Sequence, residues 1–81
     1  MQNLTDFGEK VKIALIRQKK TQNWLIEQIA KETGLFIDTG YMYKILTGQR
    51  SPTAIIAAIV RILSLQGYEV VPHGNQQSKN I

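Results

Sequence analysis

Two short apolar stripes on either side of a glycine constrain this chain more than any other feature. Within each stripe the apolar residues recur at the spacing of one helical face. The members are Leu25, Ile29 and Ala30 before Gly34, and Met42, Ile45 and Leu46 after it. This pattern predicts two helices joined by a turn.

Residues that commonly begin or end helices stand at the ends of both stripes. Thr21 can cap the first helix with its hydroxyl, and Gly34 can end it in the left-handed conformation that other residues resist. Asp38 or Thr39 can cap the second helix, and Gly48 follows its last apolar residue. The pattern is that of a helix-turn-helix, with predicted helices Gln22–Thr33 and Thr39–Leu46.

The predicted turn Gly34–Asp38 is unusually apolar, because it contains Leu35, Phe36 and Ile37. We expect a turn of this composition to pack against the body of the domain. Trp24 lies off the apolar stripe of its helix. It either covers this turn or donates its indole N–H to a phosphate.

One further helix is predicted on each side of the helix-turn-helix. The first begins at Thr5 or Asp6 and runs to about Gln18. Its apolar face comprises Phe7, Val11, Ala14 and Leu15. The last helix is predicted over Pro52–Leu65, with Ser51 as its cap and proline in the first turn, where a missing N–H has no cost.

This last helix is apolar around almost its whole circumference, which predicts burial on two sides. In so small a domain, one side can face the core and the other requires a partner, so we predict a homodimer. The following segment Tyr68–Val71 has the composition of a short strand, and pairing with its own copy across a two-fold axis is the simplest arrangement. The predicted interface residues are Ile59, Ile62, Leu65, Tyr68, Val70 and Val71.

Composition leaves few kinds of chemistry open. The chain has 81 residues, which is enough for one domain over residues 1–72 and a polar, disordered tail over 73–81. It has no cysteine and only one histidine, and it lacks a glycine-rich phosphate loop. We therefore expect no enzyme activity, no metal site and no cofactor. Neither a signal peptide nor a membrane-spanning run is visible, so we expect a soluble, cytoplasmic protein.

The positive charge of the chain favours an anionic partner. The formal net charge is +4, and no acidic residue occurs between Asp38 and Glu69. Lys44, Arg50 and Arg61 lie in that interval. A solvated basic surface with no ligand is the alternative reading of this half of the chain.

The segment Tyr43–Pro52, YKILTGQRSP, together with Thr21, Gln22, Leu25 and Gly34, resembles the Cro/CI-type, lambda-repressor-like helix-turn-helix proteins of the Xre family. The resemblance covers about residues 7–65 and is closest in style to regulators of phages and mobile elements. It implies an all-α, compact domain of four to five helices. The chain departs from the family in having Ile26 where a small alanine is usual, and in its longer turn.

The resemblance also implies which residues would contact DNA. Carried over position by position, the residues facing base edges are Thr39, Gly40, Tyr43 and Lys44, and those binding phosphates are Gln22, Thr47, Gln49 and Arg50. Tyr41 and Tyr43 could bond phosphates through their hydroxyls or be half-buried rim residues. Lys44 could donate to guanine, and Gly40 could let the backbone approach the DNA.

These observations predict a sequence-specific DNA-binding regulator, namely a dimeric repressor whose helix 39–46 enters the major groove. The alternative is a protein-binding module of the same fold, namely an antirepressor, an inhibitor, or an antitoxin with a toxin partner.

Overall fold

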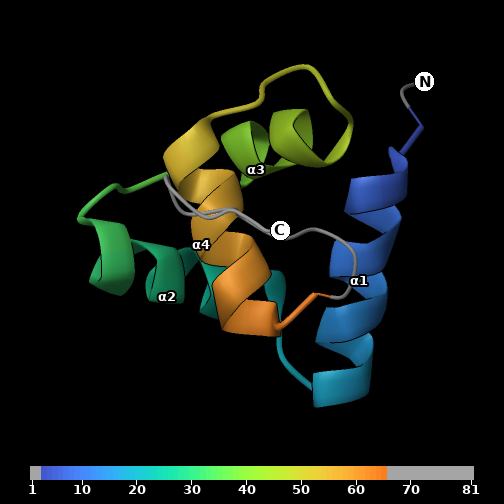
Figure 1. Cartoon of the computed structure of the whole chain (residues 1–81), viewed down its shortest axis with the longest axis horizontal. Coiled ribbons are helices and arrows are strands. Elements are labelled where there is room, and N and C mark those ends of the chain that lie inside the picture. The colour runs from blue at the N-terminus through green and yellow to red at the C-terminus, as the bar shows by residue number, and fades with distance from the viewer. Residues whose placement is uncertain (1–2, 66–81) are drawn as a thin grey trace, which may run out of the picture.

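The computed structural model describes residues 3–65, and in this part of the chain it contains helices and no strand (Figure 1). The four helices are α1 (Asp6–Gln18), α2 (Gln22–Thr33), α3 (Thr39–Leu46) and α4 (Thr53–Leu63). The predicted all-α class is therefore confirmed for the described residues. The predicted strand Tyr68–Val71 and the predicted tail 73–81 lie outside them.

Polar caps set the beginning of each of the first three helices. The Thr5 hydroxyl accepts the Gly8 N–H at 3.0 Å, and the Thr21 hydroxyl accepts the Trp24 N–H at 2.9 Å. At α3 the Asp38 carboxylate accepts the Tyr41 N–H at 2.7 Å, so Asp38 rather than Thr39 is the cap. Each cap satisfies an N–H that has no partner within its helix. The predicted bounds of these three helices are confirmed.

The bounds predicted for the last helix are wrong at both ends. The backbone of Pro52 is extended and no side chain caps α4, so Ser51 is not the cap and the helix begins at Thr53. It ends at Leu63 because Ser64 adopts the left-handed conformation, with φ 55°. The N–H groups of Ser64 and Leu65 then turn back onto carbonyls of the last turn, an end that the apolar sequence does not reveal.

The core lies where α4 crosses between α1 and α2 (Figure 1). α4 packs on both of these helices, and α3 packs against α1 and α2. The largest side chains with essentially no exposed surface come from all four helices: Val11, Leu25, Ile29, Met42, Leu46 and Ile59. The apolar faces predicted for the helices thus meet in one core. None of the described helices has the length and hydropathy needed to cross a bilayer.

A tight joint ties the start of α1 to the end of α3. The carbonyl of Leu46 accepts hydrogen bonds from both the N–H and the hydroxyl of Thr5, each at 3.1 Å. A side chain at Gly8 would place its Cβ only 2.2 Å from that carbonyl oxygen. Gly8 therefore permits the close approach that fixes α3 on the body of the domain.

The apolar turn between α2 and α3 does not pack as predicted. Phe36 is 86% exposed and Leu35 is 44% exposed, and only Ile37 packs against the core. Gly34 leaves the helix with φ 77°, and the Leu35 N–H then bonds the Thr33 hydroxyl at 3.0 Å. Trp24 is partly buried, and its ring lies 5.1 Å from the Lys20 ammonium.

Candidate nucleic-acid interface

α3 presents one continuous exposed side. Its buried residues are Met42, Ile45 and Leu46, and its exposed residues are Thr39, Gly40, Tyr43 and Lys44. At 100° per residue these four positions form a single arc opposite the core. The arc contains all four residues predicted to face base edges, and it carries no acidic side chain.

The N-terminus of α3 is already occupied by a carboxylate. Asp38 accepts the Tyr41 N–H, so the protein's own anion occupies the position that a phosphate could otherwise take. Approach of a phosphate to that helix end, which was one reading of Gly40, does not fit this arrangement. A Cβ added at Gly40 would meet only the Asp38 carboxylate oxygen, at an ordinary 3.5 Å. The fold therefore does not require glycine at position 40.

The segment after α3 folds back onto the helix end and brings further polar residues beside Lys44. The carbonyl of Lys44 accepts the N–H of Gln49 at 2.8 Å and the N–H of Arg50 at 3.2 Å. Gly48 makes this turn possible with φ 83°. The exposed side chains of Lys44, Gln49 and Arg50 consequently lie on neighbouring positions at one end of α3.

Two of the predicted contact residues are used by the fold instead. Thr47 is 8% exposed, its hydroxyl donates to the Tyr43 carbonyl at 2.8 Å, and it accepts from Gln49 Nε2 at 2.9 Å. We therefore remove Thr47 from the set of phosphate contacts, because its only polar side-chain group points inward. Tyr41 is half-buried and packs against the core, whereas Tyr43 is 46% exposed. Of the two tyrosines, Tyr43 is the one available to a ligand.

A second basic group surrounds the start of α2. The predicted phosphate contact Gln22 accepts a hydrogen bond from Lys12 Nζ at 3.1 Å. Lys19 and Lys20 lie in the preceding turn, and the first turn of α2 contains no acidic residue. Sequence reasoning missed Lys12, because it lies on a different helix and no local pattern links it to Gln22.

Arg61 is not one of the unpaired cations between Asp38 and Glu69. Its guanidinium forms an ion pair with Glu32 of α2, with an Nε–Oε2 distance of 2.9 Å. The pair joins α2 to α4 and lies on the surface. The cations of this region that no described carboxylate pairs with are Lys44 and Arg50.

The predicted dimer residues do not form one exposed surface. Ile59 is 0% exposed and belongs to the protomer's own core, so its assignment to an interface is wrong. Ile62 is half-buried. Tyr68, Val70 and Val71 lie outside the described residues. The apolar circumference of α4 is covered largely by α1 and α2 of the same chain.

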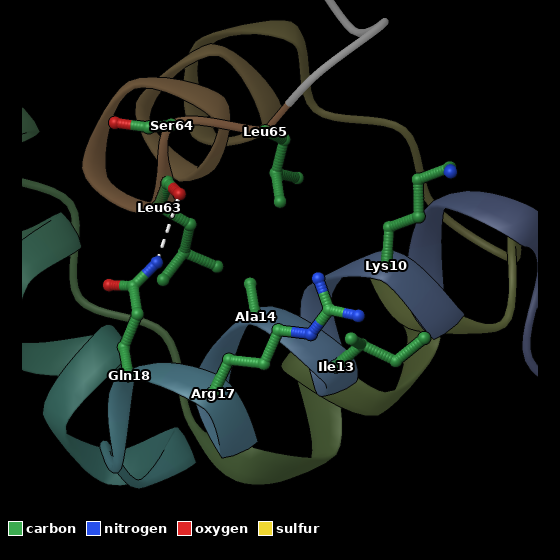
Figure 2. Close-up of a pocket in the computed structure, with 8 residues that line it drawn as sticks. All are labelled: Lys10, Ile13, Ala14, Arg17, Gln18, Leu63, Ser64 and Leu65. Atoms are coloured by element: carbon green, nitrogen blue, oxygen red, sulfur yellow. Dashed lines mark hydrogen bonds between the residues drawn. The ribbon is translucent and has the colours of Figure 1, made fainter.

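Leu65 lies in a groove between α1 and the end of α4 (Figure 2). The groove holds about 340 Å3, and the hydrogen bond from Gln18 Nε2 to the Leu63 carbonyl, 3.1 Å long, lies at one end of it. Side chains of Lys10 and Arg17 extend along its α1 side (Figure 2). Its remaining lining residues are Ile13, Ala14 and Ser64.

Within residues 3–65, no three His, Asp or Glu side chains gather as a metal-ligand set. Comparisons of the chain with known protein families, with curated proteins and with solved structures find no match.

Proposed function

We propose that this protein is a sequence-specific DNA-binding transcription regulator, acting as a dimeric repressor of the lambda-repressor-like helix-turn-helix type. In this proposal α3 enters the major groove, which admits one helix. The start of α2 and the segment after α3 contact the DNA backbone. Repression by occupying an operator requires no catalytic group.

One observation carries the proposal: the exposed arc of α3 is polar, and its Lys44 lies beside Arg50, with neither cation paired to a described carboxylate. All four arc residues are exposed, and Tyr43 is exposed by 46%, so no other part of residues 3–65 covers the arc. Lys44 and Arg50 lie next to each other through the bond to the Lys44 carbonyl. A helix face of this kind meets the steric and electrostatic needs of a major groove lined by phosphates.

The residues divide into two chemical roles. Lys44 can donate to guanine O6 and N7, and the methyl group of Thr39 can contact the methyl group of thymine. In this proposal Arg50 and Gln22 bind phosphates, and such contacts fix orientation but carry no sequence information. Lys12 belongs with Gln22 in this second role.

The test is a gel-shift assay on DNA from upstream of the protein's own coding sequence, with unrelated DNA and a salt series. Lys44→Ala should weaken specific binding by about 1–3 kcal/mol and reduce discrimination between the two DNAs. Arg50→Ala should weaken binding to both DNAs. It should also reduce the slope of log affinity against log salt concentration by about one.

Lys10→Ala is the matched control, since it removes one exposed lysine from α1 and should leave specificity unchanged. Equal affinity of the unmodified protein for both DNAs would contradict sequence-specific recognition. Absence of any shift at low salt would contradict DNA binding.

A second candidate, a protein-binding module, is favoured by the outer face of α1. Ile16 is 75% exposed, and Ile13, which lines the groove together with Lys10 and Arg17, is 47% exposed. This candidate predicts that Ile16→Ser abolishes co-purification of a second polypeptide, while Lys44→Ala has no effect. The DNA-binding proposal predicts the reverse: Lys44→Ala weakens regulation of the target gene, and Ile16→Ser leaves it unchanged.

A further inference from the structure

The most exposed large apolar side chain of the described residues, Phe36, lines a shallow groove on α2. The groove holds about 360 Å3, and its apolar lining comes from Phe36, Ile26 and Ala30. Ile26 and Ala30 lie one helical turn apart on the side of α2 next to its buried stripe. A single exposed apolar side chain is common on protein surfaces, but contiguous apolar surface rimmed by polar residues marks an interaction site.

The two charged residues of the same groove have opposite signs. Glu27 and Lys31 are exposed, lie one turn apart on α2, and are not paired with each other by a contact within 4 Å. The pattern is therefore self-complementary. If two such helices pack antiparallel, each Glu27 comes within reach of the partner's Lys31, and each Lys31 within reach of the partner's Glu27.

We infer that this α2 groove, with Phe36 at its edge, is the surface through which two copies of the chain associate. Across a two-fold axis between residues 28 and 29, Ile26 lies close to the partner's Ala30, so a large side chain meets a small one. Phe36 of each copy then covers the apolar floor of the other. This assigns the dimer of the proposed function to α2 and not to α4.

The fit of charges selects a second copy over other occupants. A groove bearing one sign of charge would suit a partner of the opposite sign. This groove carries one charge of each sign, so an antiparallel second copy can pair both. The surface is small compared with the roughly 1,200 Å2 or more of stable interfaces, so self-association should be weak, in the micromolar range or above. Binding to two half-sites on one DNA would strengthen it by raising the local concentration.

Sedimentation velocity of the full chain without DNA, over a wide concentration range, tests the assignment. Phe36→Ser should weaken dimerisation by about tenfold or more, since buried aromatic side chains dominate small interfaces. Ile16→Ser is the matched control: it removes a similarly exposed apolar side chain from α1 and should leave the dimer constant unchanged.

Charge exchange supplies the sharper measurement. Glu27→Lys alone places like charges across the interface twice and should weaken the dimer by several-fold. The double variant E27K/K31E restores both pairs and should return the dimer constant to within about twofold of the original, because the pattern is self-complementary.

A chain that stays monomeric at all concentrations overturns the inference, and so does a dimer that resists Phe36→Ser. A double variant no better than the single one also overturns it. Gel shifts run in parallel separate the two proposals. A monomer that shifts the operator contradicts only the α2 interface, and a dimer that binds no DNA contradicts only the regulator.

Discussion

α3 and α4 are both short and rich in apolar residues, yet the fold uses them in opposite ways. α3 buries Met42, Ile45 and Leu46 and leaves a polar arc exposed, and its cap Asp38 fixes where that arc begins. α4 has no capping side chain and is held by packing on α1 and α2. In this protein a helix with one apolar stripe presents a surface, whereas an apolar circumference supplies the centre of the core.

The apolar circumference of α4 is buried mainly by helices of its own chain. The sequence of α4 predicts a partner for its second side, but two neighbouring helices of the same chain cover most of it. Within residues 3–65, α1 and α2 thus bury most of such a helix. Exposed apolar surface lies instead on α1, at Ile13 and Ile16, and on the α2–α3 turn, at Leu35 and Phe36.

The largest expected effect is on α4. Ile59→Asp places a carboxylate at a position with no exposed surface, which should cost about 4 kcal/mol or more and leave most molecules unfolded. Circular dichroism during urea denaturation measures this loss. Ala54→Asp is the matched control, because Ala54 is exposed in the first turn of α4, where an acidic residue is neutral or favourable. A stable, monomeric Ile59→Asp protein would return Ile59 to the interface.

The next effect concerns the anchor of α3. Gly8→Ala brings a Cβ to 2.2 Å from the Leu46 carbonyl oxygen, so α1 and α3 must separate. We expect a loss of about 1–3 kcal/mol in the free energy of unfolding, and weaker DNA binding because the arc is displaced. Equal urea midpoints for Gly8→Ala and the unmodified chain would contradict the tight joint.

Gly40→Ala makes the same substitution on the exposed arc and should act in the opposite direction on stability. No atom lies closer than 3.5 Å to the added Cβ, so the helix should gain about 0.5–1 kcal/mol. If the backbone approaches DNA at this point, affinity should fall by about tenfold, or 1.4 kcal/mol. A stabilised protein with unchanged affinity would remove Gly40 from the contact set.

The smallest effect is expected at the ion pair between α2 and α4. Arg61→Ala should cost between about 0.2 and 1 kcal/mol, because both partners are substantially exposed. DNA affinity should not change, in contrast to Arg50→Ala. A double-mutant cycle with Glu32→Ala in urea gives the coupling energy. Loss of DNA binding by Arg61→Ala would contradict this purely structural role and add Arg61 to the DNA contacts.

Most of the fold is predictable from local chemistry. Thr5, Thr21, Asp38 and Gly34 each mark a helix end through a bond or a dihedral angle that a single residue controls. The end of α4 was not predictable in this way, because it depends on Ser64 adopting a conformation that serine rarely takes.

The candidate site was predictable only in part, since exposure depends on contacts between distant segments. The arc of α3 follows from helical spacing alone. The burial of Thr47 does not, because its hydroxyl could equally have faced solvent. The link between Lys12 and Gln22 and the contact between Gly8 and Leu46 join residues on different helices, and local patterns carry no information about either.

The bonds from Thr5 to Leu46 have a consequence for how the molecule opens. One hydroxyl serves both the first turn of α1 and the last carbonyl of α3, so fraying of the chain's beginning removes a partner from each at once. The two helix ends should therefore exchange their amide hydrogens with solvent as one cooperative unit. Extensions or truncations near Thr5 should then also loosen the C-terminal end of α3, the helix that is proposed to bind DNA.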